Sequence, residues 1–107
     1  KPMKGVEFAL CDSKGKVLET LVTDSAGHAE SGEYPIASFK DGKYKEAIVY
    51  ILKETKTLDG YKLDETEHKV VFEYVDDHTP VTSGRKPAGN TGYTEQYNFC
   101  QFTKDRR

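Results

Sequence analysis

The sequence predicts an all-β sandwich, and three observations favour this class. Short stretches alternate apolar and polar residues, as strands do when one face is buried. Turn-forming residues separate these stretches at regular spacing, which is typical of antiparallel strands joined by tight turns. No stretch of the 107 residues supports a helix of any length.

The first two predicted strands form a hairpin. The turn at 12–15, Asp-Ser-Lys-Gly, separates them, because Asp and Ser bond the local backbone and Gly accepts a positive φ. Residues 16–23 are rich in β-branched and aliphatic side chains and predict the returning strand. Alternation over residues 5–10 predicts the first strand, which carries on one face Val6, Phe8 and Leu10.

Further strands are predicted in the middle of the chain. Residues 28–33 predict a short edge strand, and residues 36–50 predict an extended hairpin with an Asp-Gly turn. The apolar run within 47–54 predicts the strand that follows, and a loop with a second Asp-Gly pair leads to a strand at 67–75. On one face of that last strand lie Val70, Phe72 and Tyr74.

The composition changes after residue 81. We therefore divide the chain into a sandwich over residues 1–81, a loop or linker over 82–92, and a possible final strand with a basic tail over 93–107. The middle segment is rich in Gly, Ser, Thr, Pro and charged residues, as linkers are. In the last segment Tyr97 and Phe99 share a face of the predicted strand.

The charge pattern argues against nucleic acid as a partner. The net charge is -2 with both signs interleaved, whereas nucleic-acid binding needs clustered Lys and Arg. The basic residues Lys104, Arg106 and Arg107 are expected to form a solvated tail. No apolar stretch has the length of a membrane span, so we expect no insertion into a membrane.

The cysteines and histidines predict neither a metal site nor an enzyme. Cys11 and Cys100 stand far apart and belong to no C-x-x-C pair, so a disulfide and two unpaired thiols are both compatible with them. The three His residues are dispersed, so we expect no metal and no cofactor. No Ser-His-Asp or Cys-His arrangement indicates catalysis.

Glu54 is the residue that most needs an explanation. It follows an apolar run and shares a strand face with Ile48, Tyr50 and Leu52. If this is the core face, the buried carboxyl group needs hydrogen-bond donors or a proton. The alternative is a solvated position at a strand end, beside a Lys. Candidate donors to a buried carboxyl group are Tyr34, Tyr44, Tyr50 and Tyr61.

Four short motifs, taken in order, resemble one protein family. They are GVEFAL at 5–10, DSKG at 12–15, TDSAGHA at 23–29 and ETKTLDGY at 54–61. Their order and spacing are similar to those of the Cna B-type, SpaA-like domains of Gram-positive pilins and surface adhesins. The resemblance covers residues 1–81, about three quarters of the chain. It implies a prealbumin-like, Ig-like β-sandwich.

The resemblance also implies a role for Glu54. In many such domains a Lys on the first strand attacks an Asn or Asp on the last strand, and a buried Glu at the position of Glu54 promotes this isopeptide bond. The family's Lys position lies upstream of residue 1, so no residue here inherits it. On the last strand, Asn98 is the candidate bond partner, although its face-mates Thr94 and Gln96 are polar.

The first strand of the family is therefore missing or replaced in this chain. One alternative is that a partner chain donates the strand, because a truncated sandwich exposes backbone edges that invite pairing. The other alternative is that the segment 93–102 pairs in its place. The sequence leaves both alternatives open.

We expect a non-enzymatic spacer or stalk module of an extracellular, cell-wall-anchored protein, with the anchor elsewhere in a longer chain. Its expected partners are the neighbouring domains of that protein. A ligand-binding adhesin module for host matrix protein or glycan is the alternative, with Tyr93, Tyr97 and Phe99 as its aromatic surface. A further alternative is an incomplete isopeptide-forming domain, completed by a strand in trans.

Overall fold

A computed structural model describes residues 2–72, 91–96 and 98–106 of the chain. Within these residues the secondary structure consists of strands and turns, without a helix. The strands are β1 (Glu7–Asp12), β2 (Val17–Val22), β3 (His28–Pro35), β4 (Ala37–Lys40), β5 (Lys43–Ala47), β6 (Val49–Lys56), β7 (His68–Val71), β8 (Thr91–Gln96) and β9 (Phe99–Asp105).

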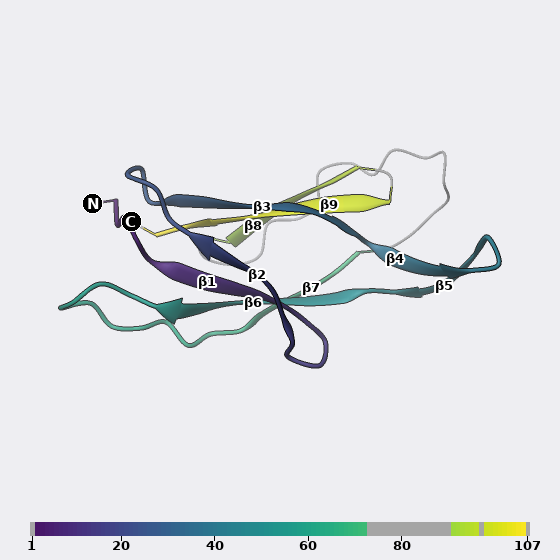
Figure 1. Ribbon diagram of the computed structural model, residues 1–107, viewed down its shortest axis with the longest axis horizontal. Coiled ribbons are helices and arrows are strands. Elements are labelled where there is room, and N and C mark those ends of the chain that lie inside the picture. Colours follow the sequence, from purple (N-terminus) through teal and green to yellow (C-terminus); the bar gives the residue numbers. More distant parts are fainter. Residues whose placement is uncertain (1, 73–90, 97, 107) are drawn as a thin grey trace.

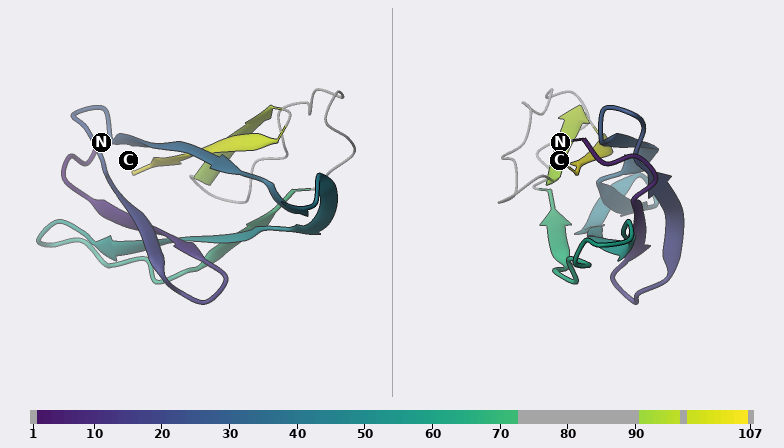
Figure 2. Two further views of the ribbon diagram at one scale, coloured as in Figure 1. Left: turned by 45° about the vertical axis from the view of Figure 1, so that its right-hand side comes forward. Right: turned by 90° about the vertical axis from the view of Figure 1, so that its left-hand side faces the viewer.

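The strands form two facing layers and one projecting hairpin (Figure 1, Figure 2). One layer is a four-stranded antiparallel sheet in the order β2-β1-β6-β7. The other is a three-stranded antiparallel sheet in the order β3-β9-β8, and β4 and β5 form a two-stranded antiparallel hairpin. The prediction of an all-β sandwich is confirmed.

The main core lies between the two layers. Val6, Phe8 and Leu10 are fully buried, which confirms the face that alternation predicted for the first strand. Phe102 of β9 belongs to the same cluster, and its ring centroid lies 5.2 Å from that of Tyr50 on β6. These contacts across the layers supply the apolar burial that holds a small sandwich together.

Two turns are built alike from the sequence Asp-Ser-x-Gly. The carboxylate of Asp12 accepts hydrogen bonds from the backbone N–H groups two and four residues later, both at 2.9 Å. The carboxylate of Asp24 does the same at 2.9 and 3.1 Å. Asp therefore fixes the reversals from β1 to β2 and from β2 to β3, as its side-chain chemistry predicts.

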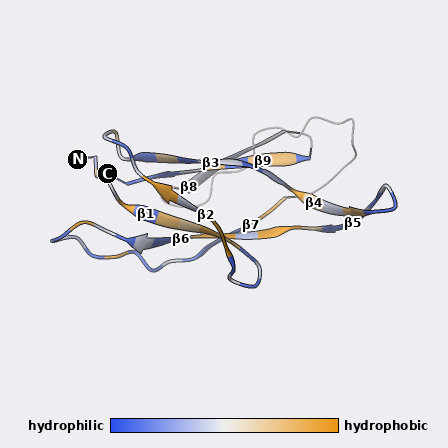
Figure 3. Cartoon of the chain, in the orientation of Figure 1, coloured by the Kyte–Doolittle hydropathy of each residue, from blue (hydrophilic) through white to orange (hydrophobic). Residues whose placement is uncertain are grey.

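The β4–β5 hairpin extends beyond the body of the sandwich (Figure 1). Asp41 and Gly42 form its turn with φ values of 53° and 75°, the left-handed conformation that an Asp-Gly hairpin turn requires. Phe39 and Tyr44 lie opposite each other, with ring centroids 6.3 Å apart. Figure 3 shows that the tip is hydrophilic, in contrast to β1.

The C-terminal segment differs from the prediction of one strand and a basic tail. It forms two antiparallel strands, β8 and β9, and β9 lies between β3 and β8 in its sheet. The tail therefore pairs within the sandwich, while both alternatives for the family's first strand, replacement by the tail and donation in trans, stay predictions. The prediction of a solvated tail is wrong for Lys104, which faces inward from β9 and is 5% exposed.

Two other predictions need comment. The edge strand predicted at 28–33 does lie at a sheet edge, but it runs on to Pro35 as part of β3. The linker prediction falls largely on residues 82–90, which lie outside the described residues, whereas Thr91 already begins β8. None of the described residues belongs to a helix long and apolar enough to cross a membrane.

Candidate functional site

Glu54 lies on the inner face of β6, as predicted. Tyr50, Leu52 and Glu54 alternate along this strand and are all buried. Tyr50 and Leu52 place this face of β6 in the core, and because side chains alternate along a strand with a period of two, Glu54 points inward as well. Its side chain is only 1% exposed, and Phe8 of β1 lies opposite it in the register.

Both carboxylate oxygens of Glu54 have a partner. Oε2 accepts a hydrogen bond from the backbone N–H of Asp64 at 2.6 Å. Oε1 lies 2.9 Å from Nε of Arg106, and this contact is an ion pair rather than a linear hydrogen bond. The carboxylate thus joins β6, the loop that follows it and the residue directly after β9.

Two of the four tyrosines that we expected as donors to Glu54 bond other groups. The hydroxyl of Tyr34 donates to Glu19 at 2.6 Å, and that of Tyr50 donates to the carbonyl of Pro35. Burial, followed by the contact with Glu19, raises the pKa of Tyr34 to about 12. Burial also raises the pKa of Tyr50. Both tyrosines tie the core to backbone and side chains away from Glu54.

Arg106 is held through its backbone as well as its side chain. Its N–H donates to the carbonyl of Gly27 at 2.7 Å, and its carbonyl accepts from the N–H of Met3 at 3.0 Å. One Nη atom donates to the carbonyl of Lys62 at 3.0 Å. The guanidinium group therefore reaches Glu54 from a fixed position.

Lys104 lies beside this ion pair on the inward face of β9. Its Nζ lies 3.3 Å from Nε2 of His68 and 5.5 Å from the centre of the Phe8 ring. Burial lowers the pKa of Lys104, and the carboxylates of Asp64 and Glu54 oppose this change. Burial also lowers the pKa of His68, and Lys104 adds to this lowering because two cations repel.

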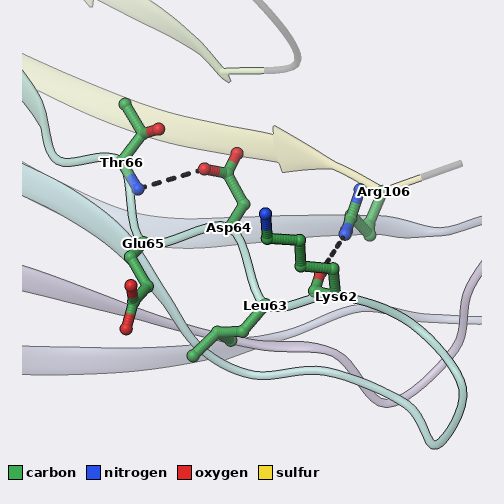
Figure 4. A pocket seen from close by; sticks show the side chains of 6 residues that line it. All are labelled: Lys62, Leu63, Asp64, Glu65, Thr66 and Arg106. Carbon is green, nitrogen blue, oxygen red and sulfur yellow. Dashed lines mark hydrogen bonds between the residues drawn. The ribbon is translucent and has the colours of Figure 1, made fainter.

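A cavity of about 650 Å³ opens next to the Glu54–Arg106 pair. Figure 4 shows the backbone carbonyl of Lys62 held by Arg106, and the carboxylate of Asp64 accepting from the N–H of Thr66. Hydrogen bonds from the side chain of Thr66 and then from its backbone N–H, the latter at 3.0 Å, lower the pKa of Asp64. The residues that line the cavity are Lys62, Leu63, Asp64, Glu65, Thr66 and Arg106.

The structure does not bring Asn98 to Glu54. The carbonyl of Asn98 accepts from the N–H of Ile36 at 2.8 Å, at the start of β9. Glu54 meets Arg106 just past the other end of that strand. Eight residue steps separate Asn98 from Arg106, which is roughly 26 Å of extended chain. The bond-forming role of Asn98 stays a prediction.

The expected aromatic surface is only partly described. Phe99 is exposed on β9, and Tyr97 lies outside the described residues. Tyr93 is half-buried and packs against Phe72, with ring centroids 4.8 Å apart in an edge-to-face arrangement. Tyr93 thus contributes to the core.

The cysteines are buried as free thiols, Cys11 in a small cluster with Ala9 and Ile51, and Cys100 in the main core. Burial raises the pKa of Cys11. In the part of the chain that the structure describes, no three His, Cys, Asp or Glu side chains are grouped to hold a metal ion.

Sequence reasoning missed Arg106, Lys104 and Asp64 as neighbours of Glu54. The sequence does predict burial of Lys104, because it shares one strand face with the buried residues Cys100 and Phe102. The contact between Arg106 and Glu54 cannot be predicted from a local pattern, since the two residues are 52 positions apart and meet only through the sheet topology.

Comparison with known families agrees with the sandwich and its ordered motifs. A family model described as SpaA, a prealbumin-like fold domain, matches residues 1–86. The chain belongs to this family. The match covers most of the 107 residues and extends five residues past the boundary that we placed at 81. No curated protein and no solved structure matches the chain.

In this SpaA domain the buried acid acts as a junction. The Glu54 carboxylate is engaged by Arg106 and by the backbone of Asp64, so both of its oxygens hold structure together. A buried ion pair of this kind is costly to break, because either partner alone would be a buried, uncompensated charge.

Proposed function

We propose that the chain is a non-enzymatic structural module of a Gram-positive bacterial surface protein or pilin, of the spacer or stalk type. Membership of the SpaA family supports a surface module. The observation that carries the structural role is the engagement of both oxygens of Glu54, by Arg106 and by the N–H of Asp64. On this proposal Glu54 closes the sandwich without a covalent bond, and the protein is extracellular.

The intact mass of the chain under denaturing conditions tests the non-covalent closure. The expected result is the full mass calculated from the sequence, with and without reductant. A mass lower by one water or one ammonia, unchanged by reductant, would mean that an internal isopeptide bond forms and that Glu54 has the promoting role implied by its family position.

A ligand-binding adhesin module is the second candidate, favoured by the exposed ring of Phe99 on β9. An array of matrix proteins and glycans separates the two candidates. The structural module binds none of them. A binding module retains a ligand, and Phe99→Ala abolishes that binding while Val71→Ala, an exposed apolar change on β7, leaves it intact.

A further inference from the structure

The two ends of the described chain are bonded to each other. The N–H of Met3 donates to the carbonyl of Arg106 at 3.0 Å, and the side chain of Met3 is buried in the core. Figure 1 and Figure 2 show the N and C marks side by side at one end of the sandwich. A chain that continues past either residue therefore continues from the same end.

The two ends lead into different layers. Met3 precedes β1, in the four-stranded sheet, and Arg106 follows β9, in the three-stranded sheet. A force that separates Met3 from Arg106 therefore pulls the layers apart at this end. The ladder bonds of β1 and β9 are then loaded one after another from the strand ends, rather than all together as in sliding along the strands.

A small set of contacts joins the layers where this force acts. The Glu54–Arg106 pair links β6 of one sheet to the end of β9 of the other. Arg106 also bonds the carbonyl of Lys62, in the loop between β6 and β7, whereas its bond to the carbonyl of Gly27 extends the β3–β9 pairing within one sheet. We call the contacts that join the layers the terminal clasp: Met3, Glu54, Lys62 and Arg106.

We propose that the contacts of the terminal clasp carry the tension when force is applied between Met3 and Arg106, and that such tension opens the sandwich from the clasp. This inference rests on the proposed structural function. It assigns the module a direction of mechanical weakness: the domain resists sliding along its strands better than separation of its ends. Forced unfolding is governed by the unfolding rate, so losing a clasp contact shows directly as faster unfolding under load.

Single-molecule force spectroscopy in two pulling directions tests the proposal. In the first, handles are fused to the two chain ends. In the second, handles are attached through azide-bearing residues that replace Lys14 and Asp59, two exposed turn positions, so that force runs along the β2-β1-β6 ladders. The expected result is a lower unfolding force between the ends than between positions 14 and 59. Equal forces, or a stronger end-to-end direction, would overturn the proposal.

Variants then test whether the terminal clasp resists this force. Glu54→Gln is expected to raise the end-to-end unfolding rate at constant force by about tenfold or more, because it leaves Arg106 without its counter-charge. The unfolding rate for force applied between positions 14 and 59 should change much less. Lys56→Gln removes an exposed ion pair to Glu7, 3.5 Å long, and is the matched control with an end-to-end rate within about twofold of wild type.

Arg106→Lys provides a second variant that keeps the positive charge but loses the planar fork. It is expected to speed end-to-end unfolding even if Glu54→Gln fails to fold. Unchanged end-to-end rates in a folded clasp variant would overturn the proposal. A ligand found on the arrays would refute the purely structural function while leaving the force measurements to decide the clasp separately.

Discussion

Nε of Arg106 lies 2.9 Å from Oε1 of Glu54, and this contact joins the end of the last strand to the opposite sheet. The Arg106 side chain is 23% exposed, whereas that of Glu54 is 1% exposed. The Glu54 carboxylate has almost no contact with solvent, so it depends on Arg106 to compensate its buried charge. Removing either group leaves a buried or half-buried charge, which is the costly way to disrupt an ion pair.

Glu54→Gln should destabilise the domain by about 2 kcal/mol, which is less than the roughly 3–5 kcal/mol of a fully buried pair because Arg106 keeps some solvent contact. The amide oxygen of Gln can still accept from the N–H of Asp64, which limits the loss. Urea unfolding followed by far-UV circular dichroism measures the change. Lys56→Gln, at the exposed pair with Glu7, is the control and should stay within about 0.5 kcal/mol of wild type. Equal effects of the two changes would contradict a special role for Glu54.

A double-mutant cycle between Glu54→Gln and Arg106→Gln isolates the pair. We expect a coupling free energy of about 1–3 kcal/mol, because the two side chains are in direct contact. Additive effects would mean that each residue stabilises the fold through other contacts.

The sequence was sufficient for the fold class because each strand carries its own signal. Val6, Phe8 and Leu10 alternate with polar residues, and all three are buried. Asp12 and Asp24 predict their turns, because Asp side chains bond the nearby backbone, as both do here. Such signals are local, so they can be recognised without knowing which strands pair with each other.

The site was predictable only as far as Glu54. The inward direction of that residue follows from its strand period, but its partners depend on long-range topology. Arg106 reaches Glu54 because β9 lies between β3 and β8 and ends beside the loop after β6. A terminal run containing three basic residues resembles a solvated tail, and the burial of Lys104 becomes apparent only when the alternation is extended through the last strand.

His28 should make the domain more stable on the acidic side of neutrality. Its ring lies 2.7 Å from Asp105 and 3.0 Å from Glu30, and these hydrogen bonds raise its pKa above 6.5. The raised pKa means that the folded state binds the proton more tightly than the unfolded state. The stabilisation is therefore fully present below pH 6.5 and is lost as the pH rises through the folded value.

The His28→Gln variant tests this dependence. Urea midpoints of wild type and variant should differ most at pH 5.5–6 and converge towards pH 8.5, because only a protonated ring gains from the two carboxylates. A constant difference across this range would contradict the prediction. Titration of the ring by NMR measures the direction of its pKa shift independently.

His68 should have the opposite effect. Burial and the nearby Lys104 lower its pKa below 6.5, so the folded state binds the proton less tightly than the unfolded state. Its contribution is present above pH 6.5 and is lost as the pH falls through the folded value. His68→Gln should therefore reduce the loss of stability between pH 7 and pH 5, measured by urea midpoints. A steeper loss in the variant would contradict this sign.

Lys104→Met should leave the free energy of unfolding within about 1 kcal/mol of wild type or raise it. Methionine has a similar length and fills the space beside Phe8, and it removes the cost of burying an ammonium group. Lys104→Ala is the comparison and should cost about 2 kcal/mol or more, because it leaves a cavity. The Met variant should also raise the pKa of His68, measured by NMR, since one repelling charge is gone.

Gly27→Ala should be much more damaging than other glycine substitutions with the same backbone conformation. A Cβ at Gly27 would lie 2.3 Å from the carbonyl oxygen of Arg106 and 3.1 Å from the N–H nitrogen of Met3, so it would force the two chain ends apart. Gly15 has a φ of 86°, against 76° at Gly27, but open space around it. Gly15→Ala therefore measures the cost of the left-handed backbone alone, about 1 kcal/mol.

We expect Gly27→Ala to cost at least about 2 kcal/mol more than Gly15→Ala, since neither neighbouring backbone group can move without breaking a hydrogen bond. Amide hydrogen exchange identifies the site of damage, because protection should fall at Met3 and Arg106 in Gly27→Ala and stay normal there in Gly15→Ala. Equal stabilities of the two variants would mean that the close approach of the chain ends contributes nothing to the fold. Reduced protection confined to the 24–27 turn would place the damage in the turn itself rather than in the contact between the ends.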